Sequence, residues 1–167
     1  WMPKQQNDDQ KPVLDKARRV FFVEKNCADI ALVRRAMTNV GYTVHLEVLQ
    51  TAEALMESLQ TQAPQVGADL ILIDLSLPEE SAFLLSRWLR KNPITRHTPI
   101  VMITSRKQEI DILRSYESGA SSAIEKPAAF TDYAHMLKDV CHYWLNVSRS
   151  PDDEANKQVN QLIANVS

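Results

Sequence analysis

Short apolar segments alternate with longer amphipathic segments along most of this chain. Five apolar runs have the length and composition of strands, at 20–23, 43–48, 70–73, 100–103 and 122–124. The runs at 70–73 and 100–103 are continuously apolar, which is typical of strands covered on both faces in a parallel sheet. After each run, apolar residues recur at helical spacing, within 30–40, 52–59, 84–89, 110–116 and 130–147.

This strand–helix order, repeated five times, predicts an α/β fold with a doubly wound, five-stranded parallel sheet. The fold occupies residues 18–147, between a polar N-terminal extension at 1–17 and a polar C-terminal tail at 148–167. Ser105 and Gln108 have the spacing of a capping box for the fourth helix, and Thr131 is a candidate cap for the fifth. Ligands of such sheets bind at the carboxyl ends of the strands, so candidate chemistry is expected there.

Composition narrows the class of protein. Nineteen Lys and Arg against 21 Asp and Glu leave a net charge of −2, which does not favour a nucleic-acid partner. Two cysteines are too few for a disulfide framework, so a reduced, cytoplasmic location is expected. Three isolated glycines exclude dinucleotide-binding and P-loop motifs. No apolar run approaches the ~20 residues of a membrane span, and the polar first 16 residues do not resemble a signal peptide.

Polar residues with complementary chemistry follow the central strands. Asp74 comes directly after the run at 70–73, Thr104 follows 100–103, and Lys126 lies just beyond 122–124. Each one alone has an ordinary structural explanation, as a loop residue, a cap or a solvated lysine. Together they place a carboxylate, a hydroxyl and an ammonium at one edge of the predicted sheet.

The segments that carry these residues resemble the receiver domains of response regulators (CheY-like), the phosphoacceptors of two-component signalling. VEKNCADIALVRRAM at 23–37 resembles the family's VEDNPAD segment, and DLILIDLSLP at 69–78 resembles its phosphoacceptor strand. PIVMIT at 99–104 and GASSAIEKP at 119–127 are similar to its fourth strand and its Lys-Pro turn. HYWLNV at 142–147 further resembles stand-alone regulators of phytochrome-type sensor kinases.

The resemblance implies a role for each matching residue. Asp74 is the expected phosphoacceptor, Thr104 the hydroxyl that bonds a phosphoryl oxygen, and Lys126 the ammonium that pairs with the phosphoryl group. Glu24 and Asp74, with the Ser76 carbonyl, match the family's Mg²⁺ ligands. The chain is therefore expected to be a non-enzymatic, single-domain response regulator that accepts a phosphoryl group from a sensor histidine kinase. The short tail after residue 147 predicts no output domain.

Three positions depart from the family's pattern. Lys25 stands where a second acidic Mg²⁺ ligand is usual, Ala123 replaces an aromatic side chain that moves with the threonine, and Ala82 replaces a loop glycine. With Lys25 in the pocket, Glu24 and Asp74 would be balanced by two lysines without any metal. Lys25 either replaces the cation and pairs with Asp74, or points to solvent and leaves a weakened site. Mg²⁺ is accordingly expected to bind weakly or not at all, with Lys25 or Lys126 near Asp74.

Two other functional classes are consistent with these departures. A phosphorylation-independent pseudo-receiver, which acts as a protein-interaction module, is favoured by Lys25 and Ala123. A small hydrolase with Asp74 as nucleophile is ranked low, because position 76 is serine rather than a second loop aspartate.

The fifth helical segment carries more apolar residues than one buried face needs. Eleven of its 18 positions are apolar, and one stripe of them is not required for packing on the sheet. We expect a homodimer through this helix, with no nucleic-acid or membrane partner. The predicted interface residues are Met136, Val140, Tyr143 and Val147. The alternative is that the tail covers this stripe with Val159, Leu162, Ile163 and Val166.

Overall fold

The computed structural model describes residues 17–38, 40, 43–62, 67–78, 80–151 and 153–166, and these residues contain a five-stranded parallel sheet. The strands lie in the order β2-β1-β3-β4-β5. This order is that of a doubly wound sheet and confirms the predicted fold class. The strands are β1 (Arg18–Val23), β2 (Val44–Leu49), β3 (Leu70–Asp74), β4 (Ile100–Thr104) and β5 (Ser122–Glu125).

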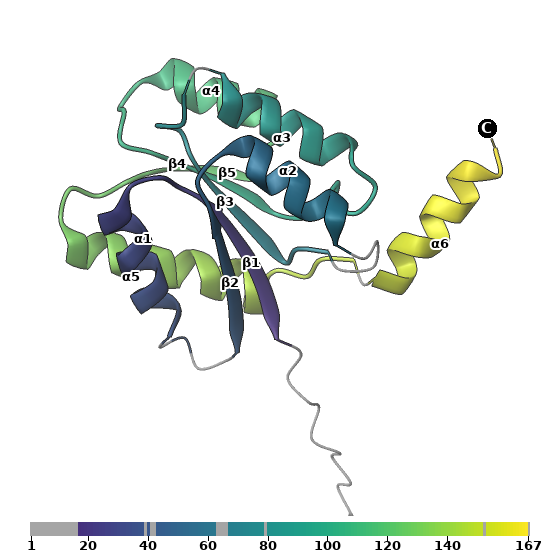
Figure 1. Cartoon of the computed structure of the whole chain (residues 1–167), viewed down its shortest axis with the longest axis horizontal. Coiled ribbons are helices and arrows are strands. Elements are labelled where there is room, and N and C mark those ends of the chain that lie inside the picture. Colours follow the sequence, from purple (N-terminus) through teal and green to yellow (C-terminus); the bar gives the residue numbers. More distant parts are fainter. Residues whose placement is uncertain are drawn as a thin grey trace, which may run out of the picture.

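Helices cover both faces of the sheet (Figure 1). One face carries α2 (Ala52–Thr61), α3 (Ser81–Lys91) and α4 (Glu109–Glu117). The opposite face carries α1 (Cys27–Met37) and α5 (Phe130–His142). Every residue of β3 and β4 is buried between these layers, which explains why both segments are continuously apolar.

The predicted helix caps are wrong in two places. The residue that precedes α4 is Gln108, which forms no side-chain capping bond, and Ser105 lies outside the helix. The reason is that the Arg106 N–H already donates to the Thr104 hydroxyl, so the chain turns before the helix begins. Helix α5 starts after the extended Ala129, which places Thr131 inside it.

Ala82, expected in the loop after β3, is buried in the first turn of α3. The departure from the family's glycine therefore falls inside a helix, where alanine is favourable.

The C-terminal part differs from the single long helix predicted for 130–147. The α-helical segment α5 ends at His142 and continues as a π-helical turn, η1 (Tyr143–Val147). A further helix, α6 (Asp153–Ala164), then extends away from the body of the molecule (Figure 1). The tail therefore does not cover the fifth helix. Its four large apolar residues are all exposed: Val159, Leu162, Ile163 and Val166.

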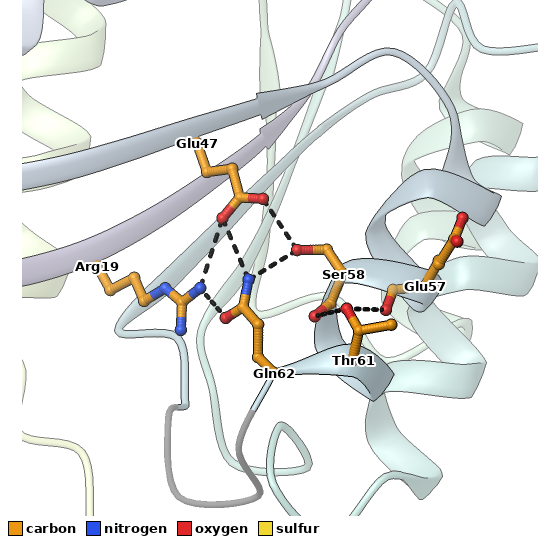
Figure 2. Close-up of polar contacts among 6 residues, drawn as sticks. All are labelled: Arg19, Glu47, Glu57, Ser58, Thr61 and Gln62. Carbon is orange, nitrogen blue, oxygen red and sulfur yellow. Dashed lines mark hydrogen bonds and ion pairs between the residues drawn. The ribbon is translucent and has the colours of Figure 1, made fainter.

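A polar network joins β1 and β2 to the last turn of α2 (Figure 2). Glu47 of β2 accepts a hydrogen bond from the Ser58 hydroxyl at 2.9 Å and forms an ion pair with Arg19 at 3.4 Å. Gln62 connects Ser58 to Arg19, because its side-chain amide N–H donates to Ser58 Oγ at 2.8 Å and its side-chain oxygen accepts from Arg19. This network fixes the end of α2 against the strands.

Candidate functional site

The predicted site residues lie at the carboxyl edge of the sheet. Asp74 and Thr104 are the last residues of β3 and β4, while Glu24 and Lys126 follow β1 and β5. Backbone bonds extend the sheet to these positions: the Glu24 N–H donates to the Leu49 carbonyl at 2.9 Å, and the Lys126 N–H donates to the Thr104 carbonyl at 2.8 Å. The sheet therefore fixes the backbone from which each side chain projects.

Three carboxylates meet at this edge. Glu24, Asp29 and Asp74 each place one potential ligand oxygen within 4.8 Å of the other two. All three are buried, with exposures of 1%, 4% and 4% respectively. Asp74 Oδ1 also accepts a hydrogen bond of 2.6 Å from the Ser76 N–H, in the loop that follows β3. The arrangement concentrates negative charge on oxygen atoms that a hard divalent cation prefers.

Glu24 is the most perturbed member of this cluster. Burial raises the pKa of Glu24 to about 8, and contact with Asp74 adds to the rise, against the lowering effect of the Asn26 N–H. That N–H donates to Glu24 Oε1 at 2.8 Å. The other oxygen, Oε2, is buried and has no hydrogen-bond partner among the residues that the structure describes. A proton or a cation would stabilise a buried carboxylate oxygen in this condition.

Asp29, the third carboxylate, is not among the site residues predicted from the sequence. The Asn26 side chain caps α1 by accepting from the Ala28 and Asp29 N–H groups, which places Asp29 in the first helical turn. A carboxylate is favourable there because of the exposed N–H groups of the helix end. The available signal was the last residue of VEKNCAD, which matches the final aspartate of the family's segment.

Lys126 lies against Asp29 rather than Asp74. Its ammonium forms an ion pair with Asp29 Oδ2 and lies 5.1 Å from the centre of the Tyr133 ring. Lys126 therefore lies at the pocket, in agreement with its predicted location, but it contacts Asp29 and not the expected partner Asp74. The cause is the position of Asp29 at the start of α1, which places its carboxylate against the Lys126 ammonium.

Lys25 does not enter the pocket. The residue is exposed and forms no ion pair with any carboxylate in the part of the chain that the structure describes. Of the two arrangements that the sequence left open, the pairing of Lys25 with Asp74 is therefore absent. Successive side chains of an extended chain point to opposite sides, and Glu24 already faces the pocket.

Thr104 is buried, and its hydroxyl is engaged with the loop that leads to α4. It accepts from the Arg106 N–H at 3.0 Å and lies 3.3 Å from the Arg106 carbonyl. On the neighbouring strand, Ala123 is half-buried, and its N–H donates to the Tyr116 hydroxyl of α4 at 3.3 Å. An aromatic ring thus lies beside position 123, although position 123 itself has none.

An open cavity of about 650 Å³ adjoins the Asp29–Lys126 pair. Its walls come from the start of α1, the loop after β4 and the loop between β5 and α5, including Asn26, Ser105 and Tyr133. Solvent-borne groups can therefore reach the pair from this side.

The predicted interface residues of the fifth helix have different surroundings. Val140 is 7% exposed and packs in the core with α1 and the sheet, so its assignment to an interface is wrong. Met136 is partly buried against the same core. Tyr143 and Val147, both in η1, are exposed, whereas Leu145 of the same turn is buried.

The fold and the strand-end site are those of a response regulator receiver domain, and the chain belongs to that family. The family model for this domain matches residues 20–138. Response regulator Rcp1 of Synechocystis is 27% identical over 135 residues, covering 79% of this chain and 92% of Rcp1.

Solved structures of phytochrome regulators are similar to this one. The phosphorylated cyanobacterial phytochrome response regulator RcpA has a TM-score of 0.74 at 25% identity, with 81% of this chain and 99% of RcpA covered. The Mn²⁺-bound form of Rcp1 has a TM-score of 0.73 at 26% identity, with the same coverage. Within the described residues, no helix is long and apolar enough to span a membrane.

Proposed function

We propose that this protein is a phosphorylatable response regulator whose Asp74 accepts a phosphoryl group from a sensor histidine kinase. The observation that carries the proposal is the position of Asp74 at the end of β3, close to two further carboxylates and hydrogen-bonded by the Ser76 N–H. The similarity to phytochrome regulators suggests a kinase of that type as partner.

The transfer requires one bond to form and one to break. An Asp74 carboxylate oxygen attacks the phosphorus of a kinase phosphohistidine, the P–N bond breaks, and the imidazole nitrogen keeps the bonding electron pair and takes a proton from solvent. Catalysis of such a step consists mostly of positioning and charge neutralisation. The chain's own contributions are the Lys126 ammonium and, once released from Arg106, the Thr104 hydroxyl.

The Mg²⁺ implied by the family fits the residues present, since Glu24 Oε2 is buried near two other carboxylates and has no hydrogen-bond partner within the described segments. Glu24 and Asp74, with the Ser76 carbonyl, would hold it, and it would neutralise charge on the transferring phosphoryl group. Because Lys25 is exposed, the arrangement that remains is the one in which position 25 supplies no ligand and the site is weakened, and the expectation of weak Mg²⁺ binding stays a prediction.

The experiment is incubation with acetyl phosphate, with Mg²⁺ or with a chelator, followed by intact mass measurement. We expect a gain of one phosphoryl group that depends on Mg²⁺ and is absent in Asp74→Asn. Asp69→Asn, at the opposite edge of the sheet, is the control and should be modified normally. If the wild type gains no mass, the pseudo-receiver alternative replaces this proposal, as Ala123 favours.

We further propose a cytoplasmic regulator without enzymatic activity of its own, acting through protein contacts rather than on nucleic acid. Its balanced charge supports this view. A homodimer through the fifth helical segment is part of the proposal, with Tyr143 and Val147 as the exposed contact residues.

A further inference from the structure

The pocket contains one more acid than the strand ends alone supply. Glu24 and Asp74 are the two strand-end carboxylates, and the neighbouring acid usual in the family is replaced by the exposed Lys25. Asp29 nevertheless joins them from the first turn of α1, with all three ligand oxygens within 4.8 Å. Asp29 therefore brings the number of carboxylates at this edge to three.

A second observation points to a missing ligand at this place. Glu24 is 1% exposed, and its Oε2 has no hydrogen-bond partner in the described part of the chain. Burial of an oxygen without a donor is costly, and the nearby ammonium of Lys126 contacts Asp29 instead. A cation bound among the three carboxylates would satisfy this oxygen.

The charges and spacings suit a divalent ion. When ionised, Glu24, Asp29 and Asp74 exceed the single charge of Lys126 by two, which one divalent cation neutralises. Opposite ligand oxygens lie ~4.2 Å apart around Mg²⁺ and ~4.6–5.2 Å apart around Ca²⁺. Only one of the three pairs can be opposite, and adjacent ligand oxygens around Mg²⁺ lie ~3.0 Å apart. The three side chains, whose oxygens lie within 4.8 Å of one another, would therefore close around the smaller ion on binding.

We infer that Asp29 is itself a ligand for a divalent cation, held jointly with Glu24 and Asp74, and that it replaces the acid missing at position 25. Helix α1 thereby contributes to a site that would otherwise be built from strand ends. The inference shares Asp74 with the proposed function and rests on it to that extent.

The competing explanation is that Asp29 only holds Lys126 away from Asp74. In that case Asp29→Asn would weaken cation binding indirectly, because the released ammonium would move toward the metal. Removing the ammonium separates the two explanations. With Lys126→Met as background, an indirect effect of Asp29 disappears, whereas the loss of a ligand remains.

The test is titration of the full chain with Mn²⁺, followed by electron paramagnetic resonance, without any phosphodonor. We expect one Mn²⁺ per chain, and at least ~10-fold weaker binding in Asp29→Asn, since even indirect changes around a metal cost that much. The loss should persist when Asp29→Asn/Lys126→Met is compared with Lys126→Met. Glu125→Gln, which removes an exposed carboxylate at the same edge, should change affinity less than ~3-fold.

Three results would overturn the inference. The first is equal Mn²⁺ affinity of Asp29→Asn and wild type, and the second is recovery of Mn²⁺ affinity in the double variant. The third is no Mn²⁺ binding by the wild type. Crystals of the wild type soaked in Mn²⁺ provide a test that does not depend on folding of the variants. An anomalous peak within ~2.6 Å of an Asp29 oxygen is expected. A peak on Glu24 and Asp74 that does not touch Asp29 refutes it. Phosphorylation of Asp74 is measured separately by mass, so the two failures are distinguishable.

Discussion

The Asp29 carboxylate and the Lys126 ammonium, 97 positions apart in the chain, form an ion pair across the strand-end pocket. The pair connects the first turn of α1 to the loop after β5. Because Asp29 is buried and Lys126 mostly so, loss of either partner leaves a charge without compensation in a poorly solvated place. The position of the Lys126 ammonium is therefore set by Asp29.

Replacing Lys25 with Asp should change Mn²⁺ affinity by less than ~3-fold, because the side chain at position 25 points away from the pocket and only the screened change of charge acts on the ion. Calorimetry measures the change. Lys107→Asp is the control, since Lys107 is an exposed lysine that lines the adjoining cavity. A gain of ~10-fold or more in Lys25→Asp but not in Lys107→Asp would contradict the outward position of residue 25.

Stability without metal should fall as the pH rises. Burial raises the Glu24 pKa to about 8, above the ~4.3 of an unfolded glutamate, so the folded state retains a proton that the unfolded state releases. The free energy of unfolding should then decrease from about pH 5 to pH 8, by on the order of 1 kcal/mol per unit at most, and level off above.

Urea unfolding in a chelating buffer at several pH values measures this decrease. Glu24→Gln cannot release the proton, so its stability should be flatter with pH than that of the wild type. Parallel curves for the two proteins would contradict the assignment to Glu24.

Substitution of Gly119 by alanine should destabilise the fold by about 1–3 kcal/mol. Gly119 has a φ of 105°, and an added Cβ would lie 2.6 Å from Arg90 Cγ. The same arginine donates from Nε to the Gly119 carbonyl at 2.7 Å, so it cannot move away freely. Chemical denaturation measures the loss.

Gly67→Ala is the matched control, because its Cβ would meet nothing closer than 3.8 Å and its φ is not in the left-handed region. This variant should be neutral or slightly stabilising. A similar loss at both glycines would rule out the proposed strain at Gly119.

Light scattering at micromolar concentration tests the dimer. We expect twice the chain mass of 19.0 kDa for the untreated protein, and a monomer for Tyr143→Asp, because a buried charge without a partner disfavours the contact. Tyr116→Asp, at an equally exposed tyrosine on α4, should remain dimeric: the two exposures are 50% and 49%. A wild-type mass near that of one chain refutes the dimer, and a dimeric Tyr143→Asp places the contact elsewhere.

Much of the architecture follows from local patterns in the sequence. The continuous apolar runs at 70–73 and 100–103 are typical of strands covered on both sides, and the helical stripes between strands favour parallel crossovers. From these, the positions of Asp74, Thr104 and Lys126 at one edge follow without further information. The helix starts at Glu109 and Phe130 were predicted less well, because backbone and loop contacts there override the cap residues.

The composition of the pocket was decided by tertiary structure. Three residues within six positions have different surroundings: Glu24, Lys25 and Asp29. Lys25, which is adjacent to Glu24 in the chain, is exposed, whereas the more distant Asp29 is buried beside Glu24. The physical reason is the change from extended chain to helix at Asn26. An extended backbone directs neighbouring side chains to opposite sides, whereas the capped first turn of α1 brings Asp29 back to the sheet edge. The sequence by itself determined which residues end the strands, and the packing of α1 against the sheet determined which third carboxylate joins them.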